Sequence, residues 1–435
     1  MGLAQSVRKS LVTLQHRLGV LLLHALSLSA ASVSGAQSAI PGPFTLPAPT
    51  GRFAVGTTRW HLVDSTRRET LNDSGGPRQV EVVAWYPIAR SSATGAARAP
   101  YLGESNAEAR AFATLIRRPG AYDSLTSVVT HATQDARPLA GRTPLPLLIF
   151  SHGYAGPASA YSALLGDLAS HGYVVLSVVH PYEVAAATLR DGAVVTFLDS
   201  AGALRAGVAA VQAEWRDEDD VMKRVTEAND EDAQRRLLRE YFAAVPKTFT
   251  ALARWVDDTK LVLDRLPTLS PATIAGKVVA RISGRRVGVF GHSMGGVTAG
   301  QFCVVDTRCK AGLNLDGIPQ LGTMIDATMP VPFLMVYSQR PGRIGASDVI
   351  YRHAASRYYR VDVDGTRHLD FSDMNFWGGP LRSFGVIGTI APERAAVITR
   401  RVVREYFDQE LLGRPSALLR GARALEGVQV TRLTR

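Results

Sequence analysis

The sequence has 435 residues, of which 46% are hydrophobic and 20% are charged. This is the composition of an ordinary globular protein with a large core, in one large domain or two smaller ones, and not that of a disordered chain. The formal net charge is +11. Because no nucleic-acid-binding motif accompanies the basic residues, we expect no nucleic-acid partner.

The first 36 residues have the order of a secretory signal peptide. A basic stretch with Arg8, Lys9 and Arg17 precedes the apolar run LGVLLLHALSLSA, and small residues lead up to Ala36. Such a run is short for a bilayer span, which takes about 20 residues. We therefore expect cleavage after Ala36 and a secreted or periplasmic protein, with a retained N-terminal anchor as the alternative. No later stretch reaches transmembrane length.

Residues 37–50 are rich in proline and are predicted to be a linker. Two segments of alternating polarity follow at 52–64 and 79–88, separated by turn-forming residues, and this pattern predicts antiparallel strands at one edge of a sheet. Residues 91–144 are irregular, with a short helix predicted over 106–116.

From Leu145 onward, short apolar strands alternate with amphipathic helices. Strands are predicted at 145–150, 173–179, 286–290, 311–316, 331–338 and 357–365, and helices at 159–172, from 293, and at 392–411. Continuous apolar strands that alternate with helices indicate a mostly parallel sheet covered on both faces. The predicted fold class is α/β, a doubly wound domain over residues 51–412 that begins with antiparallel strands.

A charged helical insertion, about residues 199–266, interrupts this alternation. It is either a solvated helical segment laced with ion pairs or an insertion near the mouth of the site that shapes substrate entry. The sequence leaves both interpretations open. Residues 413–435 form a basic C-terminal tail with five arginines and one glutamate. No aromatic residues are interleaved with these arginines, so we expect a solvated and partly disordered tail.

The stretch GHSMGG, residues 291–296, lies between the predicted strand RVGVF and the predicted helix VTAGQF. This is the setting of the nucleophile elbow, Gly-x-Ser-x-Gly. Gly291 and Gly295 stand where a sharp strand-to-helix turn brings backbone segments close together. Ser293 is thereby predicted to be a nucleophile at the carboxyl end of the sheet, over a helix N-terminus that favours an anion.

A serine hydroxyl becomes nucleophilic when a histidine takes its proton and a carboxylate holds the tautomer of that histidine. In folds with this elbow the chain order is Ser, acid, His. Asp316 ends the first strand after the elbow helix and His368 follows a later strand end, so they are the predicted acid and base. Asp348, one strand later, competes for the role of the acid. Weaker competitors are Asp326, Asp362 and Asp364 for the acid and His353 for the base.

The oxyanion of the tetrahedral intermediate needs hydrogen-bond donors. The backbone N–H of Met294, directly after the nucleophile, is one predicted donor. The loop in LPLLIFSHGYAG supplies the second, where Gly153 permits a tight turn and the N–H of Tyr154 can point into the site. His152 is expected to pack in this turn and not to act as a base.

Cys303 and Cys309 are the two cysteines of the chain. In an oxidising compartment they can pair across a short loop, and we expect this disulfide, with two separate thiols as the alternative. No zinc-like spacing of histidine and cysteine and no EF-hand loop occurs in the sequence. We therefore predict no metal and no cofactor.

Several of these segments together resemble a known family. FSHGYAGPASAYSALLGDLASHGYVV, GHSMGG, the spacing to Asp316 and GTRHLDFSD are similar to the plasma-type platelet-activating-factor acetylhydrolases. These are secreted group VII phospholipases A2 of the α/β-hydrolase fold, and the resemblance covers roughly residues 50–410. It implies that Ser293, Asp316 and His368 are the triad and that Tyr154 and Met294 supply the oxyanion N–H groups. The family often has leucine and phenylalanine at the last two positions, so a different acyl-pocket shape is expected.

The sequence thus predicts a serine carboxylic-ester hydrolase that works through an acyl-enzyme on short-acyl phospholipids or other short-chain esters. One alternative is a general polyester or xenobiotic esterase with the same triad. An alternative of another class is a non-catalytic lipid-binding module. The expected partner is a small-molecule ester or phospholipid, and the sequence leaves transient contact with a membrane surface and the oligomeric state open.

Overall fold

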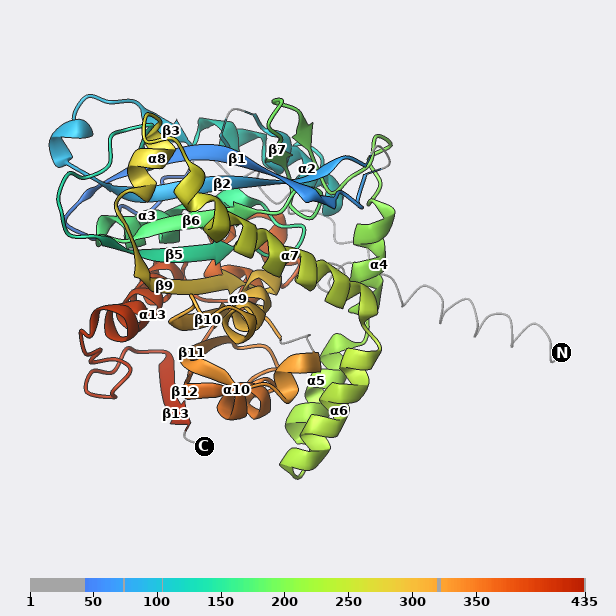
Figure 1. Cartoon of the computed structure of the whole chain (residues 1–435). Helices are drawn as coiled ribbons and strands as arrows, with labels where there is room; N and C mark the ends of the chain where they lie inside the picture. The colour runs from blue at the N-terminus through green and yellow to red at the C-terminus, as the bar shows by residue number, and fades with distance from the viewer. Residues whose placement is uncertain (1–43, 73–74, 104, 319–321, 434–435) are drawn as a thin grey trace.

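The computed structural model describes residues 44–72, 75–103, 105–318 and 322–433. In these residues, eleven strands form one large sheet (Figure 1). Its spatial order is β13 (Val428–Leu433), β12 (Ala355–Val363), β11 (Met329–Ser338), β10 (Ala311–Leu315), β9 (Ile282–His292), β5 (Leu145–Ser151), β6 (Val174–Val179), β2 (Pro77–Ile88), β1 (Ala54–Arg68), β4 (Val129–Gln134) and β3 (Arg98–Pro100). A separate two-stranded ribbon consists of β7 (Ala187–Thr188) and β8 (Val194–Val195).

The central strands run parallel, from β6 through β5, β9, β10 and β11 to β12. At one side β2 pairs antiparallel with β6, and β1 pairs antiparallel with β2. This confirms the predicted α/β class, with a mostly parallel sheet and antiparallel N-terminal strands. Parallel pairing brings the carboxyl ends of β5, β9, β10 and β12 to the same edge of the sheet, where ligands bind in open α/β folds.

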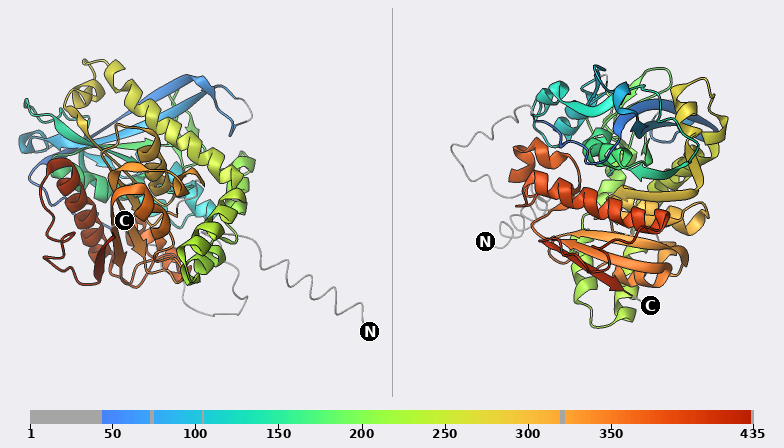
Figure 2. Two further views of the ribbon diagram at one scale, coloured as in Figure 1. Left: turned by 60° about the horizontal axis from the view of Figure 1, so that its bottom comes forward. Right: turned by 90° about the vertical axis from the view of Figure 1, so that its left-hand side faces the viewer.

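Strand β5 shows why the middle of a central parallel strand is apolar on both of its faces. Leu147 and Ile149 pack into a core cluster with α7 (Pro246–Arg265) and α9 (Met294–Val305). Leu148 and Phe150 pack into the opposite cluster with α3 (Ser162–Ser170) and α13 (Pro392–Leu412). Successive side chains of a strand point to opposite faces, so a sheet covered on both faces needs apolar residues throughout. Figure 2 gives two further views of these layers.

The helix predicted over 106–116 is present as α2, and the charged insertion forms the four helices α4, α5, α6 and α7. The helices not yet given bounds are α2 (Ala107–Leu115), α4 (Ala206–Glu214), α5 (Glu218–Glu227), α6 (Glu231–Ala243), α8 (Ile274–Val279), α10 (Asp348–Ala354), α11 (Met374–Trp377) and α12 (Pro380–Ser383). Short 3-10 turns include η3 (Ala158–Tyr161) and η6 (His368–Phe371). In Figure 1, α4, α5 and α6 lie along the right-hand side of the molecule.

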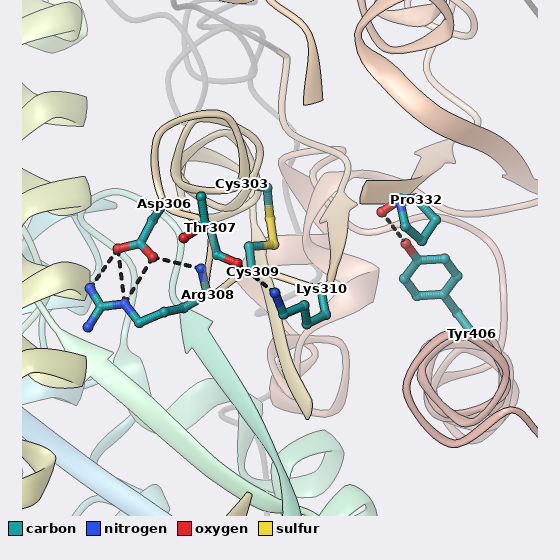
Figure 3. Close-up of a disulfide and its surroundings, with 8 residues drawn as sticks. All are labelled: Cys303, Asp306, Thr307, Arg308, Cys309, Lys310, Pro332 and Tyr406. Atoms are coloured by element: carbon teal, nitrogen blue, oxygen red, sulfur yellow. Dashed lines mark hydrogen bonds and ion pairs between the residues drawn. A yellow bond between two sulfur atoms is a disulfide. The ribbon is translucent and has the colours of Figure 1, made fainter. Parts of the chain in front are cut away.

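Cys303 and Cys309 form a disulfide, which confirms the predicted pairing (Figure 3). The bridge joins the last turns of α9 to the segment that enters β10. Within the short loop it closes, the guanidinium of Arg308 donates to Asp306, with Nη2 and Oδ2 2.6 Å apart. The disulfide therefore ties the helix that follows Ser293 to the strand that ends next to Asp316.

Both ends of the described chain pack against the domain, and the C-terminal end corrects an expectation. In the predicted linker, Leu46 is buried and the carbonyl of Pro47 accepts from Arg400 of α13. In the predicted solvated tail, β13 pairs antiparallel with β12. The sequence VQVTRL alternates in polarity, and an unpaired edge strand offers its backbone groups as a template for such a segment.

The predicted signal peptide, residues 1–36, lies outside the described residues. None of the helices in the described ranges is both long enough and apolar enough to cross a membrane.

Candidate active site

Ser293 occupies the turn between β9 and α9. Its backbone has φ 55° and ψ −124°, a conformation that residues with a side chain rarely adopt. Gly291 and Gly295 pack so closely against the Ser151 backbone that a Cβ atom at either position would overlap it. The turn has the geometry expected of a nucleophile elbow, with a strained serine held between two obligatory glycines.

Asp316 follows β10 and is held by three neighbours. Its Oδ1 accepts from the N–H of Ser338 at 2.8 Å. Its Oδ2 accepts from the Ser338 hydroxyl at 2.9 Å, from Arg340 Nη2 at 2.8 Å and from Nδ1 of His368 at 2.7 Å. Because carboxylate oxygens only accept, Nδ1 of His368 carries the hydrogen, and its Nε2 is left with a lone pair that can take a proton.

The charges of this pair follow from burial and from Arg340. Burial alone raises the pKa of Asp316, but the Arg340 guanidinium and the bond from His368 outweigh it, so the pKa lies well below its usual value. Burial lowers the pKa of His368, and Arg340 lowers it further, against the opposing effect of Asp316. Near neutral pH, Asp316 is therefore ionised and His368 is neutral, the states that an orienting acid and a general base need.

Ser293 and His368 both line two small cavities. The first has a volume of about 20 Å³ and is also lined by Asp316, Arg340 and Arg343. The second, of about 40 Å³, is walled mainly by large side chains, namely Phe112, Tyr154, Tyr161, Trp215, Leu369 and Met374. The structure thus brings the three residues of the predicted triad together and places a small apolar recess beside Ser293.

The predicted oxyanion donors also lie at these cavities. Met294 lines the first cavity and Tyr154 the second. Ala155, which follows Tyr154, has φ 56° and donates its N–H to the carbonyl of Glu183 at 2.9 Å, which fixes the loop. Within the described residues, neither the N–H of Tyr154 nor that of Met294 has a hydrogen-bond acceptor. Two such N–H groups can bind a developing oxyanion.

His292 links the oxyanion loop to His368, a role that the sequence analysis missed. Its Nε2 lies 2.8 Å from the carbonyl oxygen of His368, and its Nδ1 lies 2.9 Å from the hydroxyl of Tyr161. A carbonyl only accepts, so Nε2 carries the hydrogen and Nδ1 accepts from Tyr161. The Tyr161 hydroxyl in turn accepts from the N–H of Gly153 at 3.1 Å. Burial and the neighbouring His368 lower the pKa of His292 to about 3, which keeps it neutral.

Ser151, His180 and Asp258 form a second array with the order of a triad, behind the oxyanion loop. Nδ1 of His180 lies 2.8 Å from Asp258 Oδ2, and its Nε2 lies 3.3 Å from Ser151 Oγ. All three residues are at most 3% exposed, Arg78 forms an ion pair with Asp258, and Trp255 stacks on His180 at 3.9 Å. Because a substrate cannot reach a serine so deeply buried, this array serves to support the loop.

His152 packs in the turn, as the sequence predicts. Its Nδ1 donates to the carbonyl of Gly153 at 2.8 Å, and its Nε2 accepts from the N–H of His180 at 3.2 Å. Burial, followed by the neighbouring His180, lowers the pKa of His152 to about 3. His152 is therefore a neutral residue that holds the oxyanion loop onto the buried array.

The competing acids and base do not line the cavities at Ser293. Asp348 begins α10, where it accepts from the Tyr358 hydroxyl at 2.6 Å and from Arg360 at 2.9 Å. The other competitors also lie away from these cavities. Asp326 forms ion pairs with Arg235 and Arg239, Asp362 pairs with Arg360, and His353 pairs with Glu231, whereas Asp364 is exposed at the surface. Among the described residues, no group of three or more His, Cys, Asp and Glu side chains could hold a metal ion.

The charged insertion contributes directly to the site. Trp215, between α4 and α5, lines both cavities, and Glu218 of α5 lines the smaller one. The guanidinium of Arg343 pairs with Glu218 and Asp219 and so ties α5 to the segment that follows β11. Of the two interpretations left open by the sequence, these contacts favour an insertion at the mouth of the site.

Comparison with known protein families extends this description to most of the chain. The model of a family described as platelet-activating factor acetylhydrolase, isoform II, matches residues 44–414. The chain belongs to this family. Membership confirms the resemblance found in the sequence and the predicted enzyme class, a carboxylic ester hydrolase.

Individual relatives are distant. A probable 1-alkyl-2-acetylglycerophosphocholine esterase of Arthroderma benhamiae is 23% identical over 418 residues, which cover 88% of this chain and 92% of that protein. The platelet-activating factor acetylhydrolase of Cavia porcellus is 27% identical over 251 residues, 56% of this chain and 52% of that protein. A solved structure of a ferulic acid esterase from Streptomyces cinnamoneus aligns with a TM-score of 0.64 and 25% identity, covering 89% of this chain and 99% of that chain. This neighbour confirms the α/β-hydrolase type of fold.

Proposed function

We propose that this chain hydrolyses carboxylic esters of short acyl groups through an acyl-enzyme on Ser293. Nε2 of His368 takes the proton of the Ser293 hydroxyl as Oγ attacks the ester carbonyl carbon, and Asp316 holds the resulting imidazolium. The imidazolium then protonates the leaving alcohol. A water molecule, deprotonated by the same nitrogen, attacks the acyl-enzyme. The imidazolium then returns this proton to Ser293 Oγ as the bond from Oγ to the acyl carbon breaks and the carboxylic acid is released.

Negative charge develops on the carbonyl oxygen in both steps. We assign the N–H groups of Met294 and Tyr154 as its hydrogen-bond donors. Two observations support this: both residues line the cavities at Ser293, and neither N–H has an acceptor within the described residues. Loss of one such donor typically lowers kcat by about 10²- to 10³-fold. The N-terminus of α9 adds a partial positive charge at the same place.

The observation that carries this proposal is the 2.7 Å hydrogen bond from His368 to Asp316, with Ser293 and His368 in the walls of the same cavities. It supports a base whose tautomer is fixed with Nε2 available. A protein that only binds lipid would not need a neutral, oriented histidine and an ionised aspartate beside a serine in a strained turn.

The apolar recess supports a short acyl group. A cavity needs roughly 10–15 Å³ to hold a single water, so the recess of about 40 Å³ has room for a small group such as an acetyl. Phe112, Trp215 and Met374 close its walls. The named relatives are an acetylhydrolase and an acetylglycerophosphocholine esterase, so we propose short-acyl phospholipids or other short-chain esters as the substrate class.

The test is hydrolysis of p-nitrophenyl esters from acetate to palmitate, with and without EDTA, followed by 2-acetyl and 2-palmitoyl phosphatidylcholines. We expect the highest kcat/KM for the shortest acyl groups and no effect of EDTA. A maximum at palmitate would contradict the proposed acyl pocket. Activity lost in EDTA and restored by calcium would contradict the proposed use of backbone N–H groups.

We also propose that the chain is exported, on the basis of its first 36 residues. The Cys303–Cys309 disulfide supports this, because such bonds persist in oxidising compartments. Sequencing of the protein recovered from the periplasm or medium of the producing cell should give an N-terminus at Gln37. Recovery of the uncleaved chain from the cytosol alone would contradict export.

A further inference from the structure

Trp215 lies between the two small cavities at Ser293. In the described chain, the residues that line both cavities are Ser293, His368 and Trp215. The first two are the proposed nucleophile and base, whereas Trp215 follows α4 in the charged insertion. The smaller cavity also has Asp316 and Arg340 in its walls, and the other is the apolar recess. Trp215 therefore forms a wall common to both cavities, next to the proposed reacting groups.

A hydrogen bond and a ring contact hold the indole of Trp215 in place. Its Nε1 donates to the hydroxyl of Thr248 in α7 at 3.0 Å. The ring of Tyr154 packs edge-on against it, with centroids 5.2 Å apart. Both Trp215 and Thr248 are buried, and a buried indole N–H that loses its acceptor costs free energy, so this hydroxyl fixes the orientation of the ring. Tyr154 also carries one of the proposed oxyanion N–H groups, so its contact keeps the indole beside the oxyanion loop.

Glu214 in turn holds Thr248. Its Oε2 accepts from the hydroxyl of Thr248 at 2.9 Å and from the N–H of Thr248 at 2.7 Å, and its Oε1 accepts from the N–H of Lys247 at 2.8 Å. Both N–H groups belong to the first turn of α7, where the helix offers them no carbonyl. A hydroxyl has one proton, so Thr248 donates to Glu214 and is left to accept from Trp215. The position of the indole is thus set by the junction of α4 and α7.

An indole fixed in this way leaves little length for an acyl chain beside Ser293. The apolar recess has a volume of about 40 Å³, and Trp215 separates it from the second cavity. We propose that Trp215 is the residue that limits the acyl group to a short chain, and that Thr248 is the positioning residue that holds the indole in place. This assignment rests on the proposed esterase function, because acyl selectivity requires an acyl-enzyme.

The test compares kcat/KM on p-nitrophenyl octanoate with kcat/KM on p-nitrophenyl acetate. The ratio of the two values does not depend on the fraction of enzyme that is folded, so a purely structural defect leaves it unchanged. Trp215→Ala joins the recess to the second cavity and should raise the octanoate-to-acetate ratio by at least about tenfold, since one methylene in a hydrophobic pocket is worth about that much. Trp215→Leu keeps an apolar side chain and should raise the ratio as well.

Variants of Thr248 test the positioning role. Thr248→Val removes the hydroxyl but keeps a branched side chain, so the ratio should rise by about threefold or more. Thr248→Ser keeps the hydroxyl and should restore the ratio of the wild type. Thr250→Val is the matched control on the same helix, because the Thr250 hydroxyl is exposed and donates to the carbonyl of Pro246 within α7. This control should leave the ratio unchanged.

A second series separates the acyl side of the ester from the alcohol side. Acetates of alcohols from ethanol to octanol should show no comparable change in selectivity in Trp215→Ala. If this variant fails to fold, Trp215→Leu and Thr248→Val decide. An unchanged octanoate-to-acetate ratio in the active Trp215 variants, or a change that follows the alcohol instead, would overturn the role of Trp215.

Equal ratios in Thr248→Val and Thr248→Ser would overturn the role of Thr248. Failure of the proposed function has a different outcome: a folded wild type that hydrolyses no ester of either series would overturn that function and this assignment together.

Discussion

Replacing Asp316 by asparagine should remove nearly all esterase activity, whereas the same change at Asp348 should remove little. Asp316 Oδ2 accepts Nδ1–H of His368 at 2.7 Å, so an amide there no longer fixes the tautomer or balances the imidazolium. Loss of the orienting aspartate in serine hydrolases lowers kcat by about 10⁴-fold, which is ~5 kcal/mol of transition-state stabilisation. Asp348 contacts Tyr358 and Arg360 away from the cavities, so Asp348→Asn should cost about 1.5–3 kcal/mol of stability and spare kcat.

The assay is kcat on p-nitrophenyl acetate, with the melting temperature of each variant measured in parallel. Asp316→Asn leaves the largely covered Arg340 without its charged partner. The melting temperature of this variant should therefore fall, and rates are compared at a temperature where both variants are folded. An inactive, folded Asp348→Asn beside an active Asp316→Asn would refute the assignment of the acid.

Three more expectations concern the surroundings of the triad. Because burial and Arg340 lower the pKa of His368, activity should be lost only as pH falls below the usual histidine range near about 6.5. In Arg340→Gln the acidic limb of kcat/KM should move to higher pH by up to about one unit, and an unmoved limb would contradict this. Tyr161→Phe removes the hydroxyl that joins Gly153 to His292, so kcat should fall about tenfold with little change in KM, whereas unchanged kcat would exclude a positioning role. Ser151→Ala should retain activity, since Ser151 is buried, and a folded but inactive variant would implicate the second array.

The parts of the site that could be predicted are those that local physics dictates. Residues 145–150 of β5 are all apolar because both faces of the strand are covered, and such a continuous apolar run indicates a buried parallel strand. Gly291 and Gly295 are required where the Ser151 backbone passes close by, so the elbow is visible as a pattern of glycines between a strand and a helix. Asp316 and His368 could be placed because both follow strand ends, where parallel strands bring their ends together.

Other features depend on residues distant in sequence, and no local pattern announces them. His292 reaches Tyr161, 131 residues away, and the carbonyl of His368, 76 residues away. Its position beside Ser293 in GHSMGG was the available signal. In the charged insertion, the sequence around Trp215 does not show whether this residue lines the cavities or is an ordinary core residue. β13 was missed because a short alternating segment becomes a strand only where an unpaired edge receives it.

The central claim, that Ser293 is the nucleophile of an ester hydrolase, is tested most directly by covalent labelling with a fluorophosphonate and intact-mass measurement. The wild-type protein should gain one adduct, located on Ser293 by peptide mapping, and lose activity in proportion to labelling. Ser293→Ala should take up no label, keep the wild-type melting temperature and lose about 10³-fold or more of kcat. A folded Ser293→Ala with near-normal activity, or an adduct on another residue, would contradict the account.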